Sequence, residues 1–399
     1  MFCDEITRHI YHPYLETNLL RIYQALNLIA LSVFLLVCGD VYASDNQSFK
    51  EDALQVARDL MASESYYDQY QGAGILVEIG DKTALQLLAD GLADTDWVLM
   101  RSAIDQLLTV EHPNGLDLLY RYADITDDAM FFKFLSESLA SRPRDDLADF
   151  LVDLLESEDT WVKKHAMQAL AGSEFATKEK FMKRLADNTH EDPLTRAYAF
   201  YALLGTAHDD YAKEMLVGIT DNWGADALEV QAVGIGSFQS QLTEKRLTEL
   251  REASTYKIQI AAMASEAGFS NEAATNDLLA IIAHGKGLDP SVAAASLSRL
   301  PNARVTYITD ELIRCCDLGS DTGTRLVEAW EKVSADHSAI VEWALNNKNA
   351  DIRMQGVWLV GSKRDKKYLK AILPMLKSSD EGVKGMAAWS VIKIIGKSS

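Results

Sequence analysis

A short pattern of apolar and small residues recurs from about residue 70 to the end of the chain, at a spacing of about 32 residues. In each copy an apolar residue is followed by a small one, and another apolar residue comes four positions later. One helix pair cannot bury its apolar stripe without neighbours, so this period predicts a stacked helical array with an extended recognition surface. The small position of each copy, or its equivalent, falls at Ala73, Ala103, Leu135, Ala166, Ala199, Ala232, Ala262, Ala293, Ala329, Gly356 and Ala387.

The clearest copy begins at Asp159. Val162, Ala166 and Leu170 are spaced i, i+4 and i+8, which places them on one face of a helix. Asp159 is positioned to cap the start of that helix. A second helix is predicted over residues 178–186, followed by a polar turn that opens the next copy. The chain is therefore predicted to be all-α and built from about ten helix pairs.

Two copies depart from the pattern. The copy at Ala262 has Glu266 at its second apolar position, and the copy at Ala329 follows a polar, glycine-containing segment, residues 318–324. We expect the array to bend or loosen at that segment, which makes it the candidate boundary between subdomains. The expected organisation is a leader at 1–43, a short linker at 44–50, acidic repeats at 51–318 and C-terminal repeats with a basic cap at 319–399.

The first 43 residues resemble an export signal. Residues 25–38 form an apolar run of about 14 residues, short for a membrane span of about 20, and a small-residue pattern ends at Ala43. We therefore predict cleavage after Ala43 and a periplasmic or secreted protein. An uncleaved membrane anchor formed by residues 25–42 and lipoprotein processing at Cys38 are the alternatives.

Composition and charge narrow the function. The net charge is −20, which argues against DNA or RNA as a partner because phosphate binding needs an excess of Lys and Arg. Cleavage would leave Cys315 and Cys316, which are adjacent and form no disulfide framework. Neighbours on a helix point about 100° apart, so a disulfide between them would require local distortion. We expect structural filling, with at most one of them buried as a small hydrophobic residue, and a thioether link, a metal contact or a mixed disulfide as alternatives.

No catalytic set is visible in the sequence. The histidines are spread along the chain without metal-ligand spacing, and neither a phosphate-binding loop nor a nucleophile motif is present. We predict no catalytic residue, cofactor or metal.

The run Asp-x-x-Val-Lys-Lys-x-Ala-x-x-Ala-Leu at 159–170, its counterpart at 351–360 and Ile79-Gly80-Asp81 at a helix–helix joint resemble the HEAT-repeat family, in particular its short bacterial bilin-lyase-like branch. The resemblance covers about residues 51–396 and implies a right-handed α-solenoid. Arrays of this kind serve as scaffolds, inhibitors, transport adaptors and occasionally enzymes. It also implies a ladder in which a basic residue just ahead of the small position pairs with a loop aspartate of a neighbouring repeat. The ladder residues would be Arg101, Lys133, Lys164, Arg196, Arg353 and Lys384.

Aromatic residues follow the small position in several copies, on the helix that in this family usually lines the concave face. They form a candidate binding surface for a peptide, a glycan or a planar ligand. The alternative is that they fill gaps between repeats. These residues are Phe200, Tyr201, Trp330, Trp358 and Trp389.

The end of the chain is basic. Residues 350–399 hold ten Lys and Arg against four Asp and Glu, whereas residues 44–349 carry a net charge of −24. This end is a candidate electrostatic docking site for an acidic partner or an anionic membrane surface, or a solvated cap on the last repeat. The candidate docking residues are Lys363, Arg364, Lys366, Lys367 and Lys370.

Together these features predict an exported scaffold or adaptor that binds a protein partner at the cell envelope. A ligand-binding or lyase-like protein and a glycan or cell-wall binder are the alternatives. In an array, damage to one central interface, for example by Ala199→Asp, is expected to uncouple the two flanks.

Overall fold

The computed structural model describes residues 46–141, 144–171, 178–285 and 289–396. Contacts between residues divide the chain into two units, residues 1–52 and residues 53–399. We call the second unit the array and describe it by itself. The described residues contain helices and turns and no strand, which confirms the all-α prediction.

The proposed leader, anchor and lipoprotein site lie outside the described residues. Over the part of the chain that the structure describes, no helix combines the length and apolar character that a membrane span requires.

The array is a series of helix pairs. Residues 46–61 are helical, and the array begins within this stretch, at residue 53. The even-numbered helices are α2 (Tyr66–Val77), α4 (Trp97–Thr109), α6 (Ala129–Ser141), α8 (Thr160–Ala171), α10 (Pro193–Ala202), α12 (Ala225–Ile235), α14 (Tyr256–Gly268), α16 (Pro290–Ser296), α18 (Ser320–Ala329), α20 (Ala350–Ser362) and α22 (Glu381–Ile395). The odd-numbered helices are α3 (Lys82–Leu92), α5 (Pro113–Ile125), α7 (Ala148–Leu154), α9 (Lys178–Asp187), α11 (Asp209–Val217), α13 (Gln241–Arg251), α15 (Glu272–His284), α17 (Asn302–Cys315), α19 (Ser338–Leu345) and α21 (Leu369–Ile372). Short 3₁₀ helices are η1 (Asp145–Leu147), η2 (Asp221–Trp223), η3 (Leu297–Arg299), η4 (Lys366–Tyr368) and η5 (Leu373–Lys377).

The small residue of each copy lies where neighbouring helices touch. Ala103, Ala166 and Ala199 are completely buried. A Cβ atom added at Gly356 would lie 2.6 Å from the Cβ atom of Ala344, so nothing larger than glycine fits at that crossing of α19 and α20 without a shift. The sequence pattern therefore marks the inter-helix contacts correctly.

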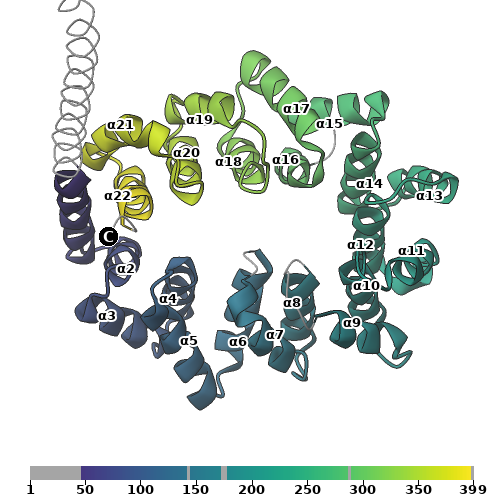
Figure 1. Cartoon of the computed structure of the whole chain (residues 1–399), viewed down its shortest axis with the longest axis horizontal. Coiled ribbons are helices and arrows are strands. Elements are labelled where there is room, and N and C mark those ends of the chain that lie inside the picture. The colour runs from purple at the N-terminus through teal and green to yellow at the C-terminus, as the bar shows by residue number, and fades with distance from the viewer. Residues whose placement is uncertain (1–45, 142–143, 172–177, 286–288, 397–399) are drawn as a thin grey trace, which may run out of the picture. The chain divides into compact units, whose positions relative to one another are not determined.

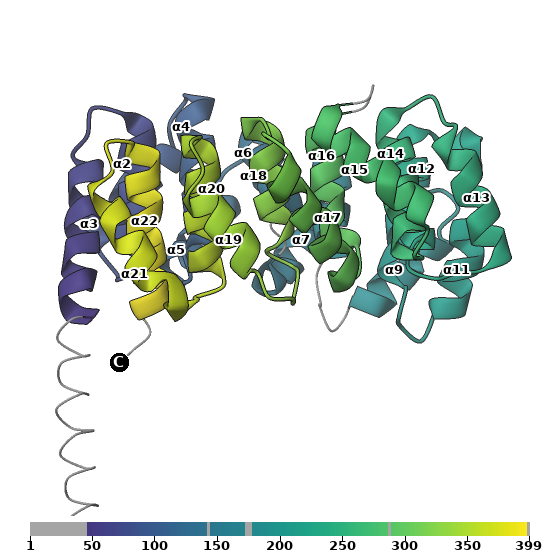
Figure 2. The same ribbon diagram turned by 90° about the horizontal axis from the view of Figure 1, so that it is seen from above.

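The even-numbered helices pack on one another in a continuous row from α2 to α22 (Figure 1). The odd-numbered helices lie on the outer side of this row, most clearly α11 and α13. The last helix, α22, then packs against α2, so the row closes on itself (Figures 1 and 2). Nothing in the repeat pattern predicts this closure.

The irregular copies are accommodated without a break in the packing. Glu266 is buried, and its carboxylate accepts a hydrogen bond from Arg251 of α13 at 2.9 Å, so the charge has a partner. Past residue 318, α16 packs on α18 and α17 packs on α19. The subdomain boundary at 318/319 remains a prediction.

The expected ladder of basic residues holds in part. Lys133 pairs with the loop residue Asp159 of the next repeat at 3.0 Å, and this bond holds the pKa of the Asp159 carboxyl below its usual value. Lys164 instead reaches Asp226 at the start of α12, and Arg353 donates to carbonyl oxygens of its own loop. The repeat pattern therefore predicts which positions are basic. It does not predict the partner, because a long Lys or Arg side chain can reach several oxygen atoms.

Candidate functional site

The closure of the row is held by a buried ion pair. Lys393 of α22 donates to the Glu78 carboxylate, just after α2, and the two side chains are 6% and 8% exposed. The other carboxylate oxygen of Glu78 accepts the backbone N–H groups of Glu111 and His112, at 2.9 and 3.1 Å. The charged oxygens are thus saturated by one cation and two amides, which offsets the cost of burying them.

A second pair extends the network outward. Arg364, just after α20, donates to the Glu111 carboxylate at 2.5 Å, and Lys393 also approaches Glu111 at 3.2 Å. Arg364 has φ of 51°, a left-handed conformation that glycine normally occupies after a helix and that costs a non-glycine residue about 1 kcal/mol. We call Glu78, Glu111, Arg364 and Lys393 the seam network, and the α2–α22 contact with its flanking turns the seam.

Close helix packing accompanies these charges. Gly385 of α22 faces Gln71 of α2 so closely that a Cβ atom at position 385 would clash with the Gln71 amide. The Gln71 side-chain oxygen is buried and has no hydrogen-bond partner among the described residues. A larger residue at 385 would therefore require the Gln71 side chain to move if α22 is to stay this close to α2.

A cavity of about 460 Å³ opens beside the seam network. We call it the seam pocket. One wall comes from the N-terminal repeats and the other from the C-terminal repeats, so the pocket exists because the row closes. Its lining residues are Leu108, Thr109, Glu111, Arg144, Glu331, Lys332, Trp358, Gly361, Ser362, Arg364, Trp389 and Lys393.

Two of the five predicted aromatic surface residues are buried in the structure, and three are partly exposed. Phe200 is fully buried, and Trp330 is 2% exposed with its indole N–H donating to Thr309 at 3.0 Å, so both pack inside the array. Tyr201, Trp358 and Trp389 keep part of their surface exposed. The seam pocket brings Trp358 and Trp389 together, and Tyr201 lies apart in α10. Whether the exposed members bind a ligand remains a prediction.

The predicted basic cluster also separates into two groups. Lys363 donates to the carbonyl oxygens of Glu331 and Val333 at 2.6 and 3.0 Å, and burial lowers the pKa of its ammonium group. Arg364 belongs to the seam network. Lys366, Lys367 and Lys370 are exposed, and Lys367 also bonds to Ser338 at 2.8 Å. The last three are the exposed members of the predicted docking set, and their docking role remains a prediction.

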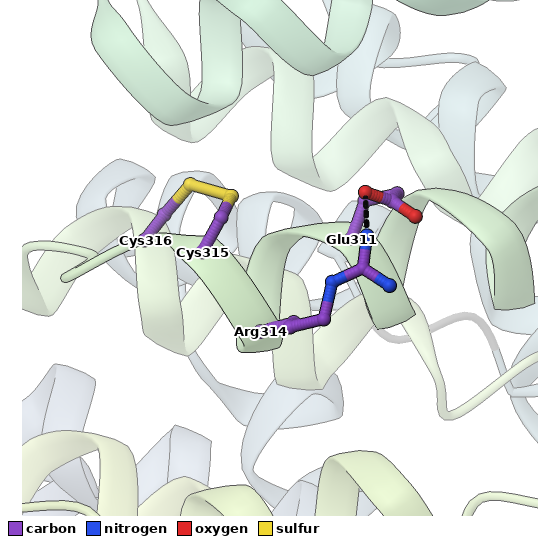
Figure 3. Close-up of a disulfide and its surroundings, with 4 residues drawn as sticks. All are labelled: Glu311, Arg314, Cys315 and Cys316. Carbon is purple, nitrogen blue, oxygen red and sulfur yellow. Dashed lines mark hydrogen bonds and ion pairs between the residues drawn. A yellow bond between two sulfur atoms is a disulfide. The ribbon is translucent and has the colours of Figure 1, made fainter.

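Cys315 and Cys316 are joined by a disulfide at the end of α17 (Figure 3). Cys315 is exposed and Cys316 half-buried, so neither is buried as a small hydrophobic residue and the expectation of structural filling is wrong. The helix ends at Cys315 and the backbone of Cys316 is extended, so the disulfide lies where the regular helix stops. Over the described residues, no group of three or more His, Cys, Asp or Glu side chains is arranged to hold a metal ion.

A row of exposed apolar side chains lies where four successive even-numbered helices begin. These residues are Tyr66 and Tyr67 of α2, Trp97 and Val98 of α4, Met130 of α6 and Trp161 of α8, and they are between 42% and 61% exposed. We call them the rim. Successive even-numbered helices run parallel because one antiparallel helix separates them, so their first turns lie at the same edge of the row. Trp97 also contacts Phe134 of α6, with ring centroids 6.1 Å apart.

The local sequence explains why the rim side chains point outward. Asp96, Asp128 and Asp159 precede α4, α6 and α8, and each accepts the backbone N–H of the residue two positions on at 2.8 to 2.9 Å. This cap fixes the first turn, and the core-facing position comes later in the helix. The repeat pattern does not predict the rim, because that pattern describes the buried positions and the rim residues lie ahead of them, in the first turn of each helix. The sequence does contain a signal for the rim: an aromatic residue follows the capping Ser65, Asp96 and Asp159 by one or two positions.

Carboxylates alternate with these apolar side chains. Each of the four turns that precede the rim helices carries at least one exposed carboxylate, at Glu64, Asp96, Asp127 and Glu158. The edge is therefore both apolar and anionic, a combination complementary to a partner with apolar and cationic groups.

No protein-family model matches the chain, and no curated protein matches it. Among solved structures, an engineered protein is 16% identical, with 86% of this chain and 98% of that chain covered and a TM-score of 0.29. A mutant of Kap121p is 14% identical, covering 86% of this chain and 41% of that chain, with a TM-score of 0.32. UNC-45 from Drosophila melanogaster is 14% identical, covering 87% of this chain and 64% of that chain, with a TM-score of 0.29.

The chain thus spans less than two thirds of the length of Kap121p and of UNC-45. Similarity at this level supports no argument about function, and the resemblance to HEAT repeats at family level remains a prediction. The packing of α2 to α22 itself shows what the chain is: an all-α array of stacked helix pairs, a helical-repeat solenoid.

Proposed function

We propose that this protein is an exported scaffold or adaptor that binds a protein partner through the rim. The observation that supports it is the recurrence of exposed aromatic and aliphatic side chains at one position of four successive repeats. Scattered exposed apolar residues are ordinary, but their recurrence in the first turns of successive packed helices is typical of an interaction surface. Trp and Tyr are also the residues that most often dominate binding energy at protein interfaces.

The partner would present apolar side chains together with Lys or Arg. The repeats of residues 44–349 carry a net charge of −24, which would speed encounter with a cationic partner and would repel nucleic acid. The export part of the proposal rests on the apolar run and small-residue pattern of the first 43 residues.

Replacing Trp97 and Trp161 with Ser is expected to reduce partner recovery about tenfold or more, since loss of one central aromatic typically costs about 2 kcal/mol. The measurement is crosslinked pull-down from envelope fractions, with partner bands quantified by mass spectrometry. A matched control carries Leu242→Ser and Tyr307→Ser, which are 66% and 45% exposed against 56% and 48% for Trp97 and Trp161, but lie on the odd-numbered helices α13 and α17. Equal recovery by the rim variant and the control would refute binding at the rim.

Contact of the basic end with an anionic membrane surface is a further part of the proposal. Changing Lys366, Lys367 and Lys370 to Gln is expected to weaken binding to phosphatidylserine-containing vesicles about tenfold or more at low salt, since each lysine contributes about 1 kcal/mol near such a surface. At high salt the difference shrinks because screening shortens the electrostatic range.

Vesicle co-sedimentation measures this effect. The control changes three other exposed lysines to Gln: Lys82, Lys245 and Lys257. Lys363 and Arg364 are left unchanged in both variants, because their hydrogen bonds belong to the fold. If both variants lose the same amount of binding, the basic end serves no specific docking role.

A further inference from the structure

The seam pocket has the composition of a ligand site, and this inference is independent of protein binding at the rim. Its lining includes four cationic side chains and two carboxylates in an array that is otherwise strongly acidic. The cations are Arg144, Lys332, Arg364 and Lys393. Arg144 is paired with Asp146 and Lys393 with the buried Glu78, so an anionic occupant would be held by the donors of Lys332 and Arg364.

Hydrogen-bond donors remain available in the pocket. The Lys393 ammonium is fully used, since it contacts Glu78, Glu111 and the carbonyl oxygen of Thr109. Lys332 is exposed and makes no hydrogen bond or ion pair with any residue that the structure describes. In Arg364 only one of the guanidinium nitrogens is bonded to Glu111, so the others keep donors for a ligand.

The pocket also has an aromatic wall. Trp358 of α20 and Trp389 of α22 are both half-buried, and Gly361 admits the Trp389 ring, because a Cβ atom there would lie 2.6 Å from it. The Lys393 ammonium lies 5.5 Å from the centre of the Trp389 ring, a cation–π contact that helps to hold the ring in place. Indole faces beside fixed cations suit a flat ring that carries a negative charge.

The two walls come from opposite ends of the array. Arg144 is anchored to the N-terminal side, where it donates to the carbonyl oxygens of Leu108 and Val110 at 2.9 and 3.1 Å. Lys332, Trp358 and Trp389 belong to the C-terminal side. A ligand that fills the pocket therefore touches both sides of the seam.

We propose that the seam pocket binds a small aromatic anion, a planar ring bearing a carboxylate, sulfonate or phosphate, and that the bound anion holds the row of helices closed. The volume of about 460 Å³ is in the range of small-ligand sites. A ligand that binds only the closed form stabilises that form by mass action.

Naphthalene-2-sulfonate is the probe, with neutral 2-naphthol as its matched analogue. Titration followed by tryptophan fluorescence is expected to show saturable binding of the sulfonate at least tenfold tighter than of the naphthol. Lys332→Gln is expected to weaken sulfonate binding about tenfold, and the exposed control Lys245→Gln is expected to leave it unchanged. Equal affinities for the two ligands, or no effect of Lys332→Gln, would overturn the anion site.

Hydrogen exchange tests the bridging. The sulfonate is expected to slow amide exchange in two segments far apart in the chain, residues 105–112 and residues 385–395, in the parent and not in Lys332→Gln. Protection confined to the C-terminal segment would show that the ligand occupies one wall and would overturn its role in closure.

Discussion

Replacing Lys393 with Met is expected to lower the free energy of unfolding of the array by about 3 kcal/mol. The substitution leaves the Glu78 carboxylate, 8% exposed, without its cation, and loss of one partner from a buried pair typically costs 3 to 5 kcal/mol. We expect the lower end of that range because the N–H groups of Glu111 and His112 still bond to the carboxylate. Urea unfolding followed by circular dichroism measures the change.

A second substitution separates charge from packing. Adding Glu78→Gln to Lys393→Met is expected to recover more than half of the lost stability, since the neutral amide oxygen can accept the same two N–H bonds and no buried charge remains. Lys348→Met is the control, because its pair with Asp317 is largely exposed and is expected to leave stability unchanged. A double variant less stable than Lys393→Met alone would show that the seam depends on shape and not on the ion pair.

The repeat and its helices could be predicted from the sequence because they are local. Val162, Ala166 and Leu170 share a helix face by spacing alone, and all three are buried as expected. The same reasoning identified Asp159 as a capping residue, and its carboxylate accepts the Trp161 N–H. Each such feature depends on residues fewer than about ten positions apart.

The seam could not be predicted because it joins residues more than 250 positions apart. Glu78 and Lys393 sit at ordinary polar positions of their copies, and their pairing depends on the sum of small rotations over ten repeats. The basic end was therefore seen as one surface, although Lys363 and Arg364 bond within the array and Lys366 does not. The burial of the aromatic residues could not be predicted either. Trp330 and Trp358 follow the small position of their copies at similar spacing, yet Trp330 is buried and Trp358 is half-buried.

Ala199→Asp is expected to cost about 3 kcal/mol or more, because Ala199 is completely buried in α10 between α8 and α12 and the new carboxylate has no partner there. In an open array this damage would separate the two flanks. In the closed row the flanks remain joined through the α2–α22 contact, so the variant is expected to unfold in one calorimetric transition at a lower temperature.

Combining Ala199→Asp with Lys393→Met is then expected to give two transitions, one for each flank. Stability in a repeat array is carried by contacts between neighbours, so a closed row must be weakened at two places before its parts melt separately. Lys393→Met alone weakens one place and is expected to keep a single transition. Differential scanning calorimetry distinguishes these cases by the number of heat-absorption peaks. Two peaks from Ala199→Asp by itself would mean that the seam does not couple the ends, and one peak from the double variant would mean that the array folds as a single core.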